Sequence, residues 1–185
     1  DFTTPMAPRS FEGDETGRCM VLVTPDGERS MSTYLGVSAN LGPDDIDEAQ
    51  MAAAKWLYLE GYRHDGPDSL AAFGKVSITL SDPFCVDRHR DEFRRLVAED
   101  VDLLFANEHE LVSLFQTATL EDALDMAKTE VPMAAVTVGP AGAYVINGAR
   151  MVHAPAAPMV RVDATGAGDL FAAGFLHGLT RGRNM

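Results

Sequence analysis

Short apolar runs alternate with helix-like segments along most of this 185-residue chain, and this alternation constrains its fold more than any other feature. The apolar runs predict strands over residues 56–60, 76–80, 103–106, 133–138 and 143–146. The intervening segments predict helices over residues 43–54, 91–99, 107–115, 120–128 and 167–179. Because the strands are continuously apolar, they are typical of a parallel sheet that is covered on both faces. The chain is therefore expected to be an α/β protein with a mostly parallel central sheet.

The amino-terminal part of the chain has a different pattern. Residues 1–17 are polar and turn-rich and predict a loop, whereas residues 18–36 predict a β-hairpin around the turn signal Pro25-Asp26-Gly27. We therefore expect a hairpin unit over 1–36 and an α/β core over 37–185. Within this core, the connection from Glu60 to Val76 has room for barely two helical turns, which is tight for a parallel crossover.

Composition narrows the range of partners. The formal net charge is −13, from 28 acidic and 15 basic residues. This argues against a nucleic-acid partner, because a surface that binds nucleic acid needs a patch of basic side chains. The two cysteines, Cys19 and Cys85, lie far apart in no metal-ligating spacing, which favours a reducing compartment. No apolar stretch is long enough to span a bilayer and no signal peptide opens the chain. We expect a cytoplasmic protein without a membrane partner.

Polar or glycine-rich clusters follow most of the predicted strands. They are Glu60, Ser81-Asp82, Asn107 with Glu110, the turn 139–142 and the segment 163–169. In an open α/β sheet, ligands bind at the carboxyl ends of the strands, so these clusters are expected on one rim of the sheet. The chain has neither a G-x-x-x-x-G-K-[ST] loop nor a strand-borne G-x-G-x-x-G, which leaves the common P-loop and dinucleotide-binding patterns unsupported.

The segment Asp163-Ala164-Thr165-Gly166-Ala167-Gly168-Asp169 leads into the last predicted helix. The N–H groups of a first helical turn lack intrahelical partners, so such a turn suits a phosphate. A carboxylate at Asp169 could accept a proton from an attacking hydroxyl, which suggests phosphoryl transfer to an alcohol. The alternative is that Gly and Ala only permit close packing and that Asp169 is an ordinary acid of the first turn.

These motifs resemble those of the ribokinase-like (PfkB) carbohydrate kinase family. Residues 163–169 are similar to that family's D-T-x-G-A-G-D signature, with Ala164 in place of a common Thr. Asn107-Glu108-His109-Glu110 is similar to its N-x-x-E motif, and residues 137–142 to its T-x-G-x-x-G turn. The motifs occur in the family's order. The resemblance implies a three-layer sandwich with a small β lid, formed here by the hairpin, and further sequence before the chain and after Arg183.

The resemblance also implies a role for each motif residue. Asp169 would be the catalytic base, and the backbone of Gly166, Ala167 and Gly168 would bind the transferred phosphoryl group. The residues that would hold ATP and Mg²⁺ are Asn107, Glu110, Thr137, Gly139 and Gly142, with Glu110 reaching the metal through water. Asp163 and the Thr165 carbonyl resemble a monovalent-cation site, which would suit K⁺. Glu60 resembles a sugar-contacting glutamate.

Simpler explanations exist for several of these residues. Asn107 with Glu110 has the spacing of a helix capping box, and the glycines of 139–142 suit an ordinary hairpin turn. The run of charges that includes Arg88 and Arg90 is more often a solvated surface than a phosphate site.

The resemblance implies an ATP-dependent kinase that phosphorylates a hydroxymethyl group of a small sugar or a nucleoside, with a homodimer through the lid as a further implication. The acceptor itself stays open between sugar and nucleoside. The alternatives are a non-catalytic nucleotide- or sugar-binding relative, which would have no need of the Asp169, Asn107 and Glu110 set, and a dehydrogenase, which the absent G-x-G-x-x-G disfavours.

Overall fold

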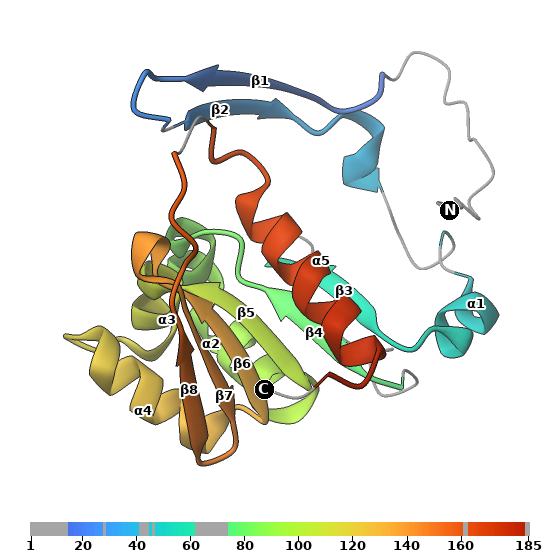
Figure 1. The fold of residues 1–185 in the computed structure, drawn as a ribbon. Coiled ribbons are helices and arrows are strands. Elements are labelled where there is room, and N and C mark those ends of the chain that lie inside the picture. Colours follow the sequence, from blue (N-terminus) through green and yellow to red (C-terminus); the bar gives the residue numbers. More distant parts are fainter. Residues whose placement is uncertain are drawn as a thin grey trace. The chain divides into compact units, whose positions relative to one another are not determined.

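A computed structural model describes residues 15–27, 29–40, 45, 47–61, 74–160 and 163–183 (Figure 1). The chain divides into two compact units, one of residues 1–48 and 159–171 and the other of residues 49–158 and 172–185. Residues 1–14 of the predicted loop over 1–17, and residues 62–73 of the connection from Glu60 to Val76, lie outside the described residues. The predicted boundary at residue 36 stays a prediction.

The first unit contains the predicted hairpin. Strands β1 (Arg18–Val23) and β2 (Arg29–Tyr34) pair antiparallel in a two-stranded sheet, and the 3₁₀-helix η1 (Gly36–Asn40) follows. The turn closes through a hydrogen bond from the Gly27 N–H to the Thr24 carbonyl oxygen at 2.8 Å. Met20 and Leu22, two-thirds exposed, show that this sheet buries little of its own apolar surface.

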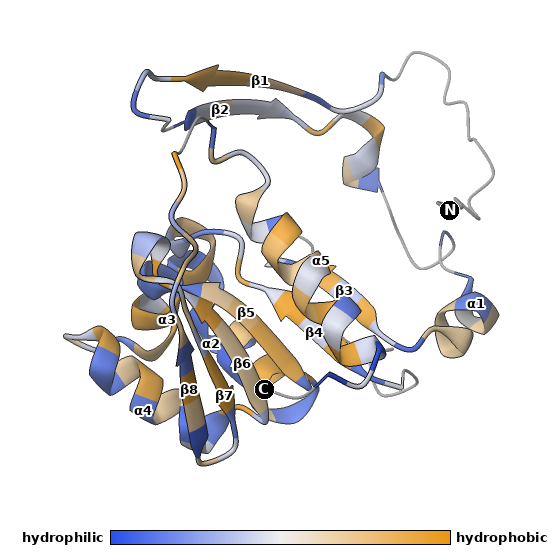
Figure 2. Ribbon diagram, in the orientation of Figure 1, coloured by the Kyte–Doolittle hydropathy of each residue, from blue (hydrophilic) through white to orange (hydrophobic). Residues whose placement is uncertain are grey.

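The second unit is built on a six-stranded sheet in the order β3-β4-β5-β6-β7-β8. The strands are β3 (Leu57–Glu60), β4 (Val76–Thr79), β5 (Leu103–Asn107), β6 (Met133–Thr137), β7 (Ala143–Asn147) and β8 (Arg150–Ala154). The pairs from β3 to β6 are parallel, whereas β7 and β8 join antiparallel. The expected mostly parallel sheet is confirmed, and the hydropathy colouring of Figure 2 shows how apolar its strands are.

Helices cover both faces of this sheet. On one face, α2 (Pro83–Glu99), α3 (Glu108–Phe115) and α4 (Leu120–Glu130) share the main core with strand residues such as Ile78 and Leu104. The next residue along β5, Phe105, points to the opposite face because side chains alternate along a strand. Its ring meets Phe175 of α5 (Ala167–Thr180) edge-on, with centroids 5.6 Å apart. The second unit is therefore layered helix, sheet and helix, as expected.

Two of the described elements differ from the sequence prediction. Helix α2 begins at Pro83 and not at Asp91, because the Asp82 side chain accepts a hydrogen bond from the Cys85 N–H at 2.8 Å and caps the helix there. Strand β8 has no counterpart among the predicted strands; it pairs with β7 across the turn at 148–149. Helix α1 covers Glu48–Ala53, and the predicted start of this helix at residue 43 lies outside the described residues.

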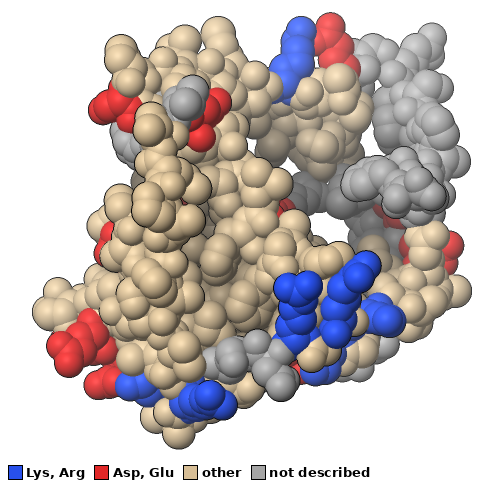
Figure 3. All heavy atoms as spheres, in the orientation of Figure 1, with Lys and Arg blue, Asp and Glu red and all other residues tan. Residues whose placement is uncertain are grey.

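Charged side chains of both signs lie on the face drawn in Figure 3. Several Lys and Arg side chains lie close together near the end of α5, and other basic and acidic side chains lie singly or beside one another elsewhere on this face. Within the described part of the chain, no helix has the length and apolar character needed to cross a membrane. The expected absence of nucleic-acid partners stays a prediction.

Candidate active site

The carboxyl ends of neighbouring strands collect the predicted polar residues of the second unit. Glu60 ends β3 and is in register with Thr79 of β4, while Asn107 ends β5 in register with Thr137 of β6. Parallel strands in register end at the same edge, so the sheet brings these residues to one rim. The predicted rim is therefore present in this unit.

Asn107 and Glu110 form a reciprocal capping box at the start of α3. The Asn107 side-chain oxygen accepts the N–H groups of His109 and Glu110, each at 2.9 Å. In return, Glu110 Oε2 accepts the Asn107 backbone N–H at 2.8 Å and Oε1 accepts Asn107 Nδ2–H at 2.7 Å. The capping interpretation is thus correct. It is compatible with a role of Glu110 near a metal ion, because each of its carboxylate oxygens has a further lone pair that can accept a hydrogen bond from a metal-bound water.

Glu110 is a buried acid. Its side chain is 5% exposed, and burial raises the pKa of its carboxyl above the ordinary value of 4.5. The Asn107 hydrogen bond opposes this rise, and the nearby charge of Asp82 adds to it. A carboxylate fixed in this way has little freedom to turn, which suits a site that must hold one geometry.

Cys85 is buried in the first turn of α2, the helix that follows β4. Burial, with a smaller contribution from the Asp82 charge, raises the pKa of its thiol to about 11. The thiol is therefore protonated at neutral pH and packs as a small apolar group. Cys85 and Cys19 are both free cysteines, the first buried and the second exposed.

The predicted nucleotide turn joins β6 to β7. After Thr137 and Val138, the chain forms a 3₁₀ turn over Gly139–Ala141, closed by a hydrogen bond from the Gly142 N–H to the Gly139 carbonyl oxygen at 3.1 Å. Gly142 has a φ of 111°, and a Cβ there would lie 2.1 Å from the Ala154 carbonyl oxygen. Only glycine fits at this point, so packing alone already requires it.

The segment 163–169 belongs to the first unit, whereas the rim residues just described belong to the second. Asp163 Oδ1 accepts the Thr165 N–H at 2.8 Å, and hydrogen bonding to Thr165 lowers the pKa of the Asp163 carboxyl. Gly166 has a φ of 73°, and its carbonyl oxygen accepts the Leu170 N–H at 2.9 Å as α5 begins. The backbone of this motif thus turns sharply into a helix, as predicted.

Asp169 is exposed in the first turn of α5. Of the N–H groups expected to bind a phosphoryl group, that of Ala167 donates to the Ala164 carbonyl oxygen at 3.2 Å. Arg29 of β2 also reaches the motif, because its Nη1 donates to the same Ala164 oxygen at 2.9 Å. No sequence signal marks Arg29, since the contact spans 135 positions along the chain.

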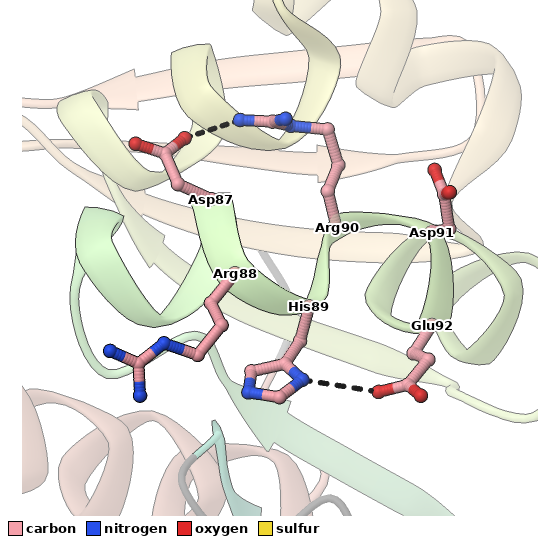
Figure 4. Close-up of a pocket in the computed structure, with 6 residues that line it drawn as sticks. All are labelled: Asp87, Arg88, His89, Arg90, Asp91 and Glu92. Atoms are coloured by element: carbon pink, nitrogen blue, oxygen red, sulfur yellow. Dashed lines mark hydrogen bonds and ion pairs between the residues drawn. The ribbon is translucent and has the colours of Figure 1, made fainter.

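The charged run on α2 forms a surface depression of about 300 Å³, lined by residues 87–92 (Figure 4). The helix is kinked here, because His89 has non-helical backbone angles. Arg90 pairs with Asp87 and donates from Nε to the Ser113 carbonyl oxygen at 2.9 Å. Arg88 lies over the Phe84 ring, 4.8 Å from its centre. Arg90 therefore ties α2 to α3, which supports the structural interpretation of this run.

The described residues include no group of three or more His, Cys, Asp or Glu side chains placed to hold a metal ion. A hydrated ion held mainly by a ligand's phosphates needs no such group, because Mg²⁺ keeps several of its waters. Glu110, with Asn107 beside it, therefore fits a contact with Mg²⁺ through a bound water better than direct coordination of the ion.

Comparison with known proteins places the chain in a family. Its sequence matches the pfkB family carbohydrate kinase profile over residues 10–185. An ATP-dependent ribose-1-phosphate kinase of Halopiger xanaduensis is 34% identical over 175 residues, covering 91% of this chain and 56% of that protein. An adenosine kinase of Saccharomyces cerevisiae is 27% identical over 198 residues, covering 92% of this chain and 56% of that protein.

A solved structure agrees with this result. The crystal structure of adenosine kinase from Sinorhizobium meliloti is similar with a TM-score of 0.87 at 43% sequence identity, covering 93% of this chain and 57% of that one. The chain thus spans little more than half the length of the relatives it matches. The profile match, the ordered motifs and the shared fold lead to one conclusion: the chain belongs to the pfkB family of carbohydrate kinases.

Proposed function

We propose that the protein containing this chain transfers the γ-phosphoryl group of ATP to a hydroxymethyl group of a small sugar or a nucleoside. The observation that carries the proposal is the retained motif set, with Asn107 and Glu110 locked together at the rim and Asp169 at the start of α5. Relatives named as ribose-1-phosphate kinase and adenosine kinase support it.

Asp169 would act as the general base. It would accept the proton of the acceptor hydroxyl as the oxygen attacks the γ-phosphorus and the bond to ADP breaks. The backbone N–H groups of Gly166 and Gly168 would stabilise the negative charge of the phosphoryl group in transit, and that of Ala167 would join them after releasing the Ala164 carbonyl oxygen. Donors fixed before the reaction cost no reorganisation when that charge develops.

Asn107 and Glu110 would hold Mg²⁺ through its bound water. When bound, the metal offsets the charge of the ATP phosphates. The turn with Thr137, Gly139 and Gly142 would contact the nucleotide. Asp163 and the Thr165 carbonyl would form a cation site for K⁺, and the Asp163 carboxylate, with its lowered pKa, has the charge that such a site needs.

The proposed acceptor class rests on a chemical group that the substrates in the relatives' names have in common. Ribose 1-phosphate and adenosine both contain a ribose ring with a free hydroxymethyl group. Glu60, at the end of β3, would contact the hydroxyls of the acceptor. The hairpin over residues 18–36 would form a lid that excludes water, whose attack on ATP competes with transfer. The exposed apolar side chains of this hairpin suit a homodimer. We place the protein in the cytoplasm, where free cysteines persist.

A coupled assay of ADP release tests the proposal. The full-length protein is given Mg-ATP with ribose, ribose 1-phosphate, fructose, adenosine or cytidine, one at a time. We expect one of these acceptors to stimulate ADP release well above the rate with ATP alone. ATP binding without stimulation by any acceptor would contradict the proposal and favour a non-catalytic relative.

A further inference from the structure

The turn after β4 is strained. Ser81 has a φ of 69°, a left-handed conformation that residues with side chains rarely adopt. The Asp82 N–H donates to the Leu80 carbonyl oxygen at 2.9 Å, so Ser81 is the central residue of a γ-turn. Such strain persists only where the surrounding structure holds it, and it is concentrated at functional sites.

The Ser81 hydroxyl joins two neighbouring strands at the rim. Its Oγ lies 2.9 Å from the Gly61 N–H and 3.4 Å from Glu60 Oε2. Because a backbone N–H can only donate, Oγ accepts from Gly61, and its single proton is left for the Glu60 carboxylate. The left-handed turn therefore points one hydroxyl at the end of β3, where it serves both Gly61 and Glu60.

Gly61 packs tightly against the end of β4. A Cβ at this position would lie 2.7 Å from the Leu80 carbonyl oxygen and 2.9 Å from that of Thr79. Any other residue would push the two strand ends apart. The close approach of Gly61 thus sets the distance across which Ser81 reaches Glu60.

We infer that Ser81 is a positioning residue that orients the Glu60 carboxylate toward the hydroxyl groups of the acceptor. This role rests on the proposed function. Glu60 is exposed at the strand end, and the Ser81 hydroxyl is one of the contacts that restrict its carboxylate; losing this contact would let the carboxylate sample more rotamers and lose more freedom on binding. Ser81 acts through Glu60 and not on the transferred phosphoryl group. Its loss should therefore weaken acceptor binding and leave ATP binding unchanged.

The test compares Ser81→Gly with a matched control in the full-length protein. Glycine accepts the left-handed φ without strain and removes the hydroxymethyl side chain of Ser81. The control is Ser77→Ala, which removes another β4 hydroxyl, bonded to the Leu57 carbonyl oxygen at the opposite end of the strand pair. ADP release is measured with ribose or adenosine varied at saturating Mg-ATP, and then with ATP varied.

We expect Ser81→Gly to raise the KM for the acceptor about 3- to 10-fold while the KM for ATP stays at the wild-type value. Ser77→Ala should leave both values unchanged. In a Glu60→Ala background, adding Ser81→Gly should change the acceptor KM by less than about twofold, because no carboxylate is left to orient.

The outcomes separate this role from the proposed function. If the wild-type protein shows no acceptor-stimulated ADP release, the proposed function fails and this role fails with it. If the wild type is active and Ser81→Gly keeps the wild-type acceptor KM, only the role of Ser81 is contradicted. Equal increases in the KM for ATP and for acceptor would also contradict it, because they indicate a general structural effect.

Discussion

Both carboxylate oxygens of Glu110 accept hydrogen bonds from the same residue, Asn107, one from its backbone N–H at 2.8 Å and one from its side-chain amide at 2.7 Å. Glu110 is buried, and Asn107 also caps α3. One residue pair therefore starts a helix and fixes a buried acid at the rim of the sheet.

Removing the Asn107 side chain should destabilise the fold more than an ordinary cap does. Asn107→Ala removes the cap and one partner of a buried carboxylate, so we expect the free energy of unfolding to fall by about 2–4 kcal/mol. The control is Thr119→Ala at the exposed start of α4, where Thr119 Oγ1 accepts the Asp122 N–H at 3.1 Å. That change should cost about 1 kcal/mol. Urea unfolding of both variants measures the difference, and equal losses would contradict this account.

The raised pKa of Glu110 should make stability depend on pH. Between the ordinary value of 4.5 and the higher pKa in the folded state, the folded protein binds more protons at this group than the unfolded chain does. The free energy of unfolding contributed by Glu110 therefore falls as the pH rises through that window. Urea unfolding of the wild type and of Glu110→Gln, from about pH 4.5 to about pH 8, checks this sign.

Glutamine also suits the third position of a capping box, so Glu110→Gln removes the titration and keeps most of the helix start. The free energy of unfolding of Glu110→Gln minus that of the wild type should increase with pH between the ordinary pKa of 4.5 and the higher pKa of Glu110 in the folded state. A difference that stays constant would show that Glu110 titrates alike in both states.

Alanine at Gly142 should be far more harmful than at another glycine with positive φ. A Cβ at Gly142 would meet the Ala154 carbonyl oxygen, whereas Gly148, with a φ of 54°, has open space around it. We expect Gly142→Ala to lower the free energy of unfolding by about 2–4 kcal/mol and Gly148→Ala by about 1 kcal/mol. Thermal or urea unfolding of the two variants measures these losses. Similar losses of unfolding free energy would show that the positive φ causes the effect and that the close contact with the Ala154 carbonyl oxygen does not.

The two cysteines should differ sharply in reactivity. Cys19 is exposed, whereas Cys85 is buried with its thiol pKa raised to about 11. At pH 8, an aromatic disulfide reagent should modify Cys19 rapidly and Cys85 only after unfolding. Cys19→Ser should abolish the fast phase. A fast phase that survives in this variant would mean that Cys85 is accessible in the folded protein.

Local signals in the sequence are sufficient to predict the strands from β3 to β7 and the helices α3, α4 and α5. The capping box of Asn107 and Glu110 is also readable, because it depends only on a spacing of three residues. The true start of α2 was readable too. Asp82 followed by Pro83 is a standard helix start, because Asp is a common N-cap residue and Pro suits the first helical position. Likewise, Asn147-Gly148 is a strong hairpin signal that indicates β8.

Contacts between distant segments could not be predicted in the same way. The left-handed Ser81 accepts a hydrogen bond from Gly61, which lies 20 positions away in the chain. The contact from Arg29 to the Ala164 carbonyl oxygen depends on the fold of the first unit. Neither residue type nor local spacing encodes such contacts, because they form only once separate elements have packed.

The most direct test of the central claim is the turnover of Asp169→Asn. With the full-length protein, Mg-ATP and an acceptor that stimulates the wild type, we expect kcat to fall by roughly 10²–10⁴, because the attacking hydroxyl loses its base. Asp125→Asn, at an exposed acid of α4, is the control and should keep wild-type turnover. Asp169→Asn should still bind ATP and unfold like the wild type. Turnover near the wild-type rate in Asp169→Asn would contradict the account.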